Sequence, residues 1–323
     1  MWKTTLRRFI ILIPQLFALS ILIFVLAEFM PGDALTGLWE DPTMCPYEVR
    51  AIRERHGLYD PWYVRYVRWV GNMFRGDFGN SLVHRIPVTD MIGERMGNTI
   101  LLSTLSVLII YAFAIPLGII AGRFHGRWPE RAISFYNFIQ LAFPNVVLAL
   151  MLQWLFALRL GWLPLVGSVD VLTVAQGSTF QIFLSRIEHA TLPALALSLL
   201  AGVGVIQLLA NEINDNKNMD YANLAISKGV PLNQVYTRHI FRNALLPIAA
   251  SSGGIIVGLF SGAVITETIF SYNGMGRLFV SSIGGQDWPV ANFLIIFYST
   301  LSVIGFLISD IVLTIFDPRI RIK

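Results

Sequence analysis

Long stretches of apolar residues alternate with shorter polar segments along most of this chain. A helix needs about 20 mostly apolar residues to cross a hydrocarbon core of roughly 30 Å, because each residue advances it by about 1.5 Å. The stretches that reach this length are Phe9–Phe29, Thr99–Ala121, Ala132–Leu158, Leu192–Ile213, Pro247–Thr268 and Asn292–Phe316. The pattern therefore predicts an all-α integral membrane protein with six transmembrane helices.

Basic residues next to these stretches predict the orientation, because Lys and Arg accumulate in short cytoplasmic loops. With the N-terminus inside, the basic residues on the inner side are Lys3, Arg7, Arg8, Arg123, Arg127, Arg131, Lys217, Lys228, Arg238, Arg242, Arg319, Arg321 and Lys323. Both termini are thus expected in the cytoplasm. The first apolar stretch is longer than the core of a signal peptide, so we expect an uncleaved span.

The spans divide the chain into an N-terminal helix (1–30), an extracytoplasmic segment (31–98), a core transmembrane domain (99–316) and a cytoplasmic tail (317–323). The core contains a long inner loop at 211–246. The external segment is predicted to be helical, with an amphipathic helix at 46–55 and another that begins after Pro61. Aromatic residues at helical spacing in this second helix favour a small core or an interfacial anchor over a ligand site.

The composition narrows the class of protein further. Hydrophobic residues make up 55% of the chain and charged residues 14%, with a mean hydropathy of +0.62. Soluble domains average about a quarter charged residues, so a soluble protein is excluded. The net charge of +4 fits basic inner loops, and no basic face interleaved with aromatic residues indicates nucleic-acid binding. The single cysteine, Cys45, has no disulfide partner and no metal-ligand spacing.

Polar residues interrupt several spans and cost free energy unless they have partners. Asn145 and Gln153 lie in the third span, Glu267 at the end of the fifth and Asp310 in the sixth. They fit a polar pathway through the membrane and hydrogen bonds between helices equally well. Both interpretations stay open at this point.

Backbone features predict how the spans bend and pack. Pro116 and Pro144 are expected to kink the second and third spans, because proline removes a backbone donor and clashes with the preceding turn. Close helix packing is predicted by three small residues spaced four apart in the fifth span, namely Gly254, Gly258 and Gly262. This packing could be within the chain or against a partner subunit.

The inner loop between the fourth and fifth spans is predicted to hold a short helix. Asp220 can cap its N-terminus, and Gly229 with Pro231 can end it. Its shared face is expected to carry Tyr221, Leu224, Ala225 and Lys228. A solvated loop with an interfacial helix and a docking site for another protein are both compatible with these residues.

The spacing in this loop resembles the cytoplasmic "EAA" loop of ATP-binding-cassette import permeases. The match comprises Tyr221, Ala225, Lys228 and Gly229, followed by Arg238 to Pro247. The long glycine-to-proline distance is similar to the peptide and nickel class. Other segments resemble elements of that class in the same order along nearly the whole chain, namely Met30–Asp33, Gly57–Pro61, Arg75–Ser81, Glu267–Arg277 and Asp317–Arg321.

The resemblance implies a type I importer permease fold in a bacterial or archaeal cytoplasmic membrane, with a helical extracytoplasmic segment after the first helix. It implies a transport subunit rather than an enzyme, which pairs with a second homologous permease and receives peptides from an extracytoplasmic substrate-binding protein. Two ATPase subunits would hold ATP and magnesium, since this chain carries no Walker A run and no cofactor of its own. The resemblance also implies that the ATPase docks on Tyr221, Ala225, Lys228 and Gly229.

In this scheme ATP drives rigid-body alternating access of a central cavity. The third to fifth spans, with Asn145, Gln153 and the glycine face, would border the cavity or the partner permease. Dipeptides, longer peptides, glutathione and nickel chelates all remain candidate substrates, with peptides favoured.

Two other classes of function are weighed against an importer. An ion-coupled secondary transporter working without an ATPase could use Glu267 and Asp310 to bind protons or cations. Such transporters usually carry internal repeats, and none is found here. A membrane enzyme would need a catalytic motif such as HExxH or GxSxG, and the sequence has neither.

Overall fold

The computed structural model describes residues 10, 13–22, 24–25, 47, 54 and 59–316. Inside this part, the side chains at 261, 262, 306, 310 and 312–316 are not described. The helix expected at 46–55, the packing of Gly262, the side chain of Asp310 and the tail at 317–323 therefore lie outside the described residues.

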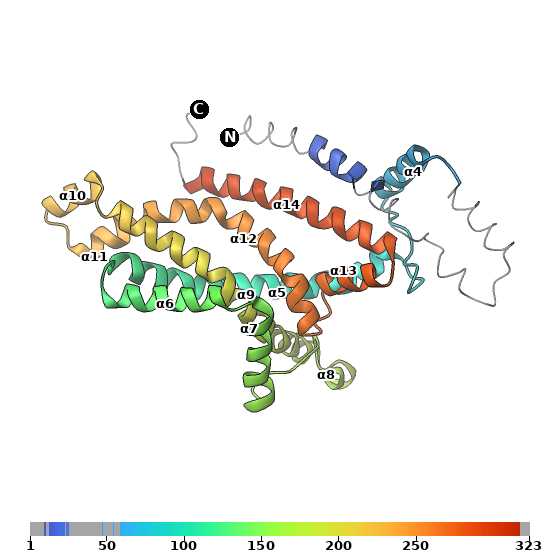
Figure 1. Ribbon diagram of the computed structural model, residues 1–323, viewed down its shortest axis with the longest axis horizontal. Coiled ribbons are helices and arrows are strands. Elements are labelled where there is room, and N and C mark those ends of the chain that lie inside the picture. The colour runs from blue at the N-terminus through green and yellow to red at the C-terminus, as the bar shows by residue number, and fades with distance from the viewer. Residues whose placement is uncertain are drawn as a thin grey trace.

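The described part of the chain is helical, and its longest helices run side by side along the long axis of the molecule (Figure 1). These helices are α5 (Val88–Arg123), α9 (Thr179–Asn216), α12 (Phe241–Ile269) and α14 (Trp288–Phe316). Helix α12 continues a helical run through α11 (Leu232–Gln234) and the π-helix η2 (Val235–Ile240). The all-α membrane class predicted from the apolar pattern is confirmed.

The described residues do not confirm all six expected spans. Among them, four helices are long and apolar enough to cross a membrane, and a bent pair would make five. In the first apolar stretch the structure describes an apolar helix over Ile13–Leu22, which is too short on its own for a span.

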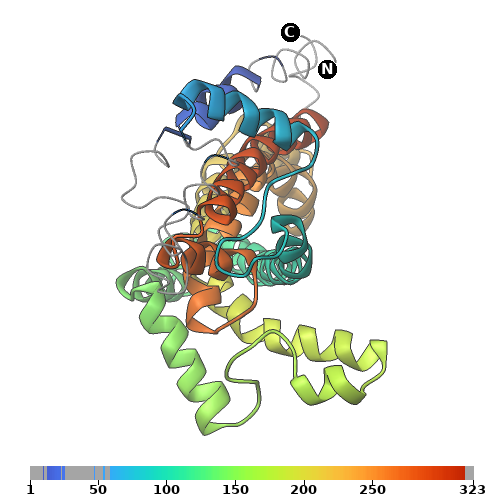
Figure 2. The same ribbon diagram turned by 90° about the vertical axis from the view of Figure 1, so that its right-hand side faces the viewer.

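The third predicted span, Ala132–Leu158, is broken rather than continuous. Helix α6 (Trp128–Ala142) and the run formed by α7 (Asn145–Leu152) and the π-helix η1 (Gln153–Arg159) meet at an angle of 101°. Between them Phe143 has an extended backbone (φ −90°, ψ 127°), as expected before a proline. The break expected at Pro144 is thus much sharper than a kink, and α7 leaves the side of the bundle (Figures 1 and 2).

Two helices extend well beyond the hydrocarbon thickness. Helix α5 has 36 residues and α9 has 38, which corresponds to about 54 Å or more at 1.5 Å per residue. Helix α9 starts with a capping box between Ser178 and Gln181, so its first backbone donors are satisfied before the apolar stretch begins. The boundary expected between residues 98 and 99 falls inside α5, which is one continuous helix.

Glycines let the long helices approach closely. A Cβ atom at Gly118 would lie 2.9 Å from the Leu209 Cβ atom, and one at Gly122 would lie 2.7 Å from the Ile213 Cβ atom. Helices α5 and α9 are therefore joined along one seam that a larger side chain would wedge apart. A similar close approach joins α12 to α14, where Gly253 lies against the backbone of Gly305.

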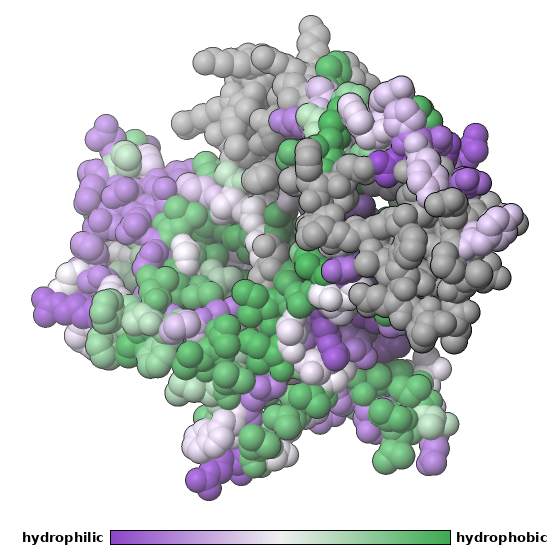
Figure 3. Space-filling model, turned by 45° about the vertical axis from the view of Figure 1, so that its right-hand side comes forward, coloured by the Kyte–Doolittle hydropathy of each residue, from purple (hydrophilic) through white to green (hydrophobic). Residues whose placement is uncertain are grey.

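The bundle has two distinct ends, which we name after the short helices found there. The α10 end carries α10 (Asp220–Ser227), and the α13 end carries α13 (Met275–Gly284) and α4 (Trp62–Phe74) (Figure 1). On the face shown in Figure 3, hydrophobic residues cover the middle of the bundle and hydrophilic residues gather at the α10 end. This arrangement suits a bundle surrounded by lipid.

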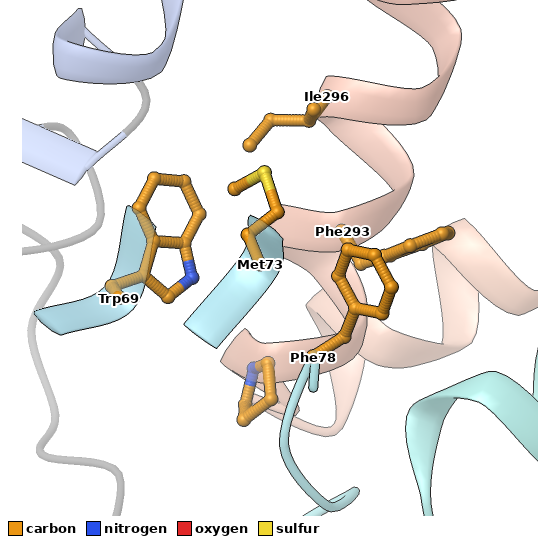
Figure 4. Close-up of a pocket in the computed structure, with 6 residues that line it drawn as sticks. Trp69, Met73, Phe78, Phe293 and Ile296 are labelled. Carbon is orange, nitrogen blue, oxygen red and sulfur yellow. The ribbon is translucent and has the colours of Figure 1, made fainter. Parts of the chain in front are cut away.

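Helix α4 confirms the helix predicted after Pro61, and its aromatic residues form a small core. The Tyr66 ring contacts the rings of Phe17 and Phe24 in the first apolar stretch, and its hydroxyl is 2.7 Å from Ser20 Oγ. Farther along α4, Trp69 and Met73 face the start of α14 across a narrow apolar pocket that is completed by Phe78, Pro289, Phe293 and Ile296 (Figure 4). Packing accounts for Tyr66 and Trp69, whereas Trp62 and Tyr63 at the start of α4 remain exposed.

Candidate functional site

Helix α10 lies at the tip of the loop that joins α9 to α12. Its N-cap is Met219, so the prediction that Asp220 caps it is wrong. Asp220 is instead the first helical residue, where a negative charge interacts favourably with the helix dipole. The helix ends as predicted at Gly229, whose φ of +77° is a conformation that side chains with a Cβ rarely adopt.

The two faces of α10 have different environments. Ala222 and Ala225 are buried against the chain's own core, with Ala225 only 8% exposed. The half-buried Tyr221 donates a hydrogen bond from its hydroxyl to Asn216 Oδ1 at 2.5 Å, which ties α10 to the end of α9. Tyr221 and Ala225 therefore position α10 instead of forming its outer surface.

The exposed positions of α10 and of its N-cap include large apolar side chains on more than one side of the helix. Met219 is 51% exposed, Leu224 56% and Ile226 45%, and Lys228 is exposed beside them. The four residues of the predicted face therefore differ in exposure, because Leu224 and Lys228 are exposed whereas Tyr221 is half-buried and Ala225 is buried. The sequence carries a signal for these residues, because they are large apolar side chains in a segment that is otherwise rich in Asn and Asp.

The second half of the loop contacts the end of α5. The Arg123 guanidinium donates a hydrogen bond from Nη2 to Asn233 Oδ1 at 2.7 Å and lies over the Tyr236 ring, 5.2 Å from its centre. Tyr236 is in the π-helix η2, a rare geometry that occurs often at functional sites. Sequence reasoning counted Arg123 only as a charge that sets orientation.

At the α13 end, Glu267 is completely buried and its carboxylate is occupied by donors from the same chain. It accepts a hydrogen bond from Thr99 Oγ1 at 2.8 Å and another from the Arg277 backbone N–H at 2.9 Å. The Thr99 hydroxyl oxygen in turn accepts from the Met275 N–H at 2.8 Å. A carboxylate at the first turn of α13 satisfies helix donors that have no partner within the helix, so Glu267 joins α12, α5 and α13.

Glycines make room for this carboxylate. A Cβ atom at Gly274 would collide with the Glu267 carboxylate, and one at Gly276 would lie 2.6 Å from the Val264 Cα atom. Both glycines belong to the segment Glu267–Arg277 that resembles the peptide and nickel class. Only the structure shows why these two positions need a residue without a Cβ atom. We call Thr99, Glu267, Gly274, Gly276 and the Arg277 N–H the α13 clamp.

Further hydrogen bonds surround the α13 clamp. Burial raises the pKa of the Tyr272 phenol well above its usual range, so the hydroxyl stays protonated and donates to the Asn98 carbonyl oxygen at 3.1 Å. Asn98 Nδ2 donates to the Asn273 carbonyl oxygen at 2.8 Å. Nearby, the buried Asp287 accepts hydrogen bonds from Ser81 Oγ and the Leu82 N–H, which fixes the segment before α5.

The remaining candidate residues do not share one surface. Gln153 is buried and donates from Nε2 to the Leu165 carbonyl oxygen at 3.0 Å, whereas Asn145 is half-buried. Gly254 and Gly258 lie on an exposed face of α12 with no atom near a Cβ position, so they do not pack within the described part of this chain. The close packing expected of them occurs at Gly253 instead.

No group of three or more His, Cys, Asp or Glu side chains that could hold a metal ion is found among the described residues. Glu267 is fully buried, and each of its carboxylate oxygens accepts a hydrogen bond from this chain. These contacts favour a structural part for Glu267.

Comparison with known proteins identifies relatives of the whole chain. Residues 114–322 match the family described as "Binding-protein-dependent transport system inner membrane component". The chain is 37% identical over 316 residues to the oligopeptide transport system permease protein AppB of Bacillus subtilis strain 168, and 98% of each chain is covered. It is 30% identical over 323 residues to the glutathione transport system permease protein GsiC of Escherichia coli strain K12, and each chain is fully covered.

Proposed function

Because the chain belongs to the family of binding-protein-dependent transport system inner membrane components, we propose that it forms one half of a peptide pathway and that α10 docks an ATPase subunit. Family members are transport subunits, not enzymes, of systems that also contain ATPase and substrate-binding components. The proposal adds a second homologous permease, two ATPase subunits that hold ATP and magnesium, and a peptide substrate.

The observation that carries the docking role is the exposure of large apolar side chains on α10. Met219, Leu224 and Ile226 are exposed at the polar end of a membrane protein (Figure 3). Large apolar side chains on so short a helix favour a protein partner, because burying apolar area is favourable. Tyr221 and Ala225 hold the helix against the bundle, Lys228 is exposed near its end, and Gly229 sets the direction in which the chain leaves it.

The same end is proposed to face the cytoplasm. Exposed basic residues gather in its loops and helix ends, namely Arg123, Arg127, Arg131, Lys228, Arg238 and Arg242. Basic loops remain on the cytoplasmic side during insertion. The α13 end and the segment before α5 then face outward, where a substrate-binding protein docks, and ATP drives alternating access between the two sides.

Substitution of Gly229 tests the docking proposal. In the reconstituted transporter, Gly229→Val should lower peptide uptake per ATP hydrolysed by about tenfold, within the usual range of coupling between sites. Gly126→Val is the matched control, because Gly126 also has open space and a φ of +79° but lies in a different loop. An unchanged ratio in Gly229→Val, with the ATPase still bound, would contradict the docking role of this loop.

The peptide substrate is supported by the relatives, which are named for oligopeptide and glutathione transport. Radiolabelled tetra-alanine and radiolabelled glutathione are suitable probes for vesicles that contain the complete system. ATP-dependent accumulation of either is expected. Failure of both, together with accumulation of a nickel chelate, would overturn the peptide assignment and leave the docking role intact.

A further inference from the structure

We infer that Arg123 is a positioning residue that fastens the α10 loop to α5, so that α5 carries movement from the ATPase-docking end to the α13 clamp. This inference rests on the proposed function, because it concerns how docking at α10 reaches the rest of the molecule. The proposal assigns a role to a residue outside the loop that binds the ATPase.

The contacts of Arg123 are specific to a guanidinium. One nitrogen donates to Asn233 Oδ1, while the planar group lies over the rings of Tyr236 and Phe124 at 5.2 and 5.5 Å. Stacking and hydrogen bonding at the same time require the flat, delocalised cation of arginine. A lysine could keep the charge but not both contacts.

Neighbouring arginines show that charge alone does not explain this position. Arg127 and Arg131 also belong to the basic set of this end, and both are exposed. The structure gives neither side chain a hydrogen bond or ion pair within the described ranges. Arg123 alone of these three joins the end of one long helix to the segment that follows α10.

Helix α5 packs closely against α9, so a displacement at Arg123 would move both helices. Gly118 and Gly122 bring it into close contact with Leu209 and Ile213 of α9, the helix that leads into α10. The α10 loop is thus bound to α9 by the chain and by the Tyr221 hydrogen bond, and to α5 by Arg123.

At the other end of α5, Thr99 donates to Glu267 and accepts from Met275. A displacement of the loop therefore moves α5 and α9 together. Through Thr99 it reaches the α13 clamp at the far end.

The test uses the complete transporter in nanodiscs with a reporter at the far end of α5. Cys45 is replaced by serine, the partner subunits are cysteine-free, and Gly93→Cys places a spin label at an exposed position with open space around it. The measured quantity is the change in label mobility between the nucleotide-free and the ATP–vanadate state. Arg123→Ala should reduce this change about threefold to tenfold while the ATPase content stays at the parent level.

Matched variants separate transmission from folding. Arg127→Ala and Tyr236→Phe should behave like the parent, because neither removes the guanidinium–ring contact. Tyr236→Leu should reduce the ATP-dependent change in label mobility as Arg123→Ala does. The double variant should reduce it little further, as expected for residues that act through one contact. Arg123→Lys should keep only part of this change in mobility.

The possible failures are distinguishable. If the parent label responds to ATP and Arg123→Ala responds equally, the inference about Arg123 is overturned and the docking proposal stands. If Arg123→Ala loses the ATPase, Arg123 belongs to docking itself and the positioning role is also overturned. If ATP does not change the label in the parent while ATP-dependent peptide uptake is intact, α5 does not carry the movement, so the inference is overturned and the proposed function stands. If the parent also shows no ATP-dependent uptake, the proposed function fails as well.

Discussion

The two ends of the helix bundle are stabilised in opposite ways. At the α13 end, a fully buried carboxylate, tightly placed glycines and hydrogen bonds from separate segments hold α5, α12 and α13 together. At the α10 end, side-chain hydrogen bonds from Tyr221, Asn223 and Arg123 hold the loop, and large apolar side chains remain exposed. Local stability varies in this way when one region must move or bind while another stays fixed.

The largest effect is expected for Glu267→Ala, which removes the centre of the α13 clamp. The variant leaves the buried Thr99 hydroxyl and the Arg277 N–H without their acceptor, and an unpaired buried group costs about 1–3 kcal/mol, so about 3 kcal/mol or more of unfolding free energy should be lost. Glu212→Ala at the α10 end should lose less than about 1 kcal/mol, because Glu212 is half-buried and bonds only within its own helix. Unfolding in mixed detergent micelles measures both, and similar losses would remove the contrast between the ends.

A smaller loss is expected for Gly276→Ala. Its Cβ atom would meet the Val264 backbone at 2.6 Å, and overpacking of this kind costs about 1–3 kcal/mol. Gly97→Ala is the matched control in α5, where the same methyl group meets open space. That variant should be stabilised by about 0.5–1 kcal/mol, because alanine favours a helix more than glycine does. Equal effects of the same sign would contradict the packing at Gly276.

The smallest effects come from removing single hydroxyl groups. Tyr272→Phe leaves the Asn98 carbonyl oxygen without its donor and should cost about 1–2 kcal/mol in the same unfolding measurement. Tyr221→Phe should leave global stability within about 1 kcal/mol, while backbone hydrogen exchange in α10 becomes faster. Unchanged exchange in α10 would show that this hydroxyl does not hold the helix.

Much of the fold could be predicted because it depends on local pattern. Apolar stretches locate the long helices, Pro144 marks the break between α6 and α7, and Gly229 marks the end of α10. The size of the break could not be predicted, since it is set by contacts on both sides of the proline. The lengths of α5 and α9 were also underestimated, because polar turns beyond the apolar stretch continue the helix.

The α13 clamp could not be predicted, because its parts come from distant segments. In the sequence, a glutamate at the end of a span fits an ion-binding group as well as a structural one. The placement of Thr99 and the first turn of α13 against it favours the structural interpretation. The sequence also could not show which glycines of α12 pack against another helix. Gly253 and Gly254 are adjacent, but Gly253 packs against Gly305 and Gly254 is exposed.

The open glycines of α12 bear on how this subunit can be produced. Gly254 and Gly258 leave an exposed strip of α12 without side chains, and small residues at this spacing let another helix approach closely. A lone chain lacks the packing that such a helix would add, so it should open more often to states that proteases can cleave. Co-expression with a subunit that packs on this strip should then raise the amount of intact protein in the membrane.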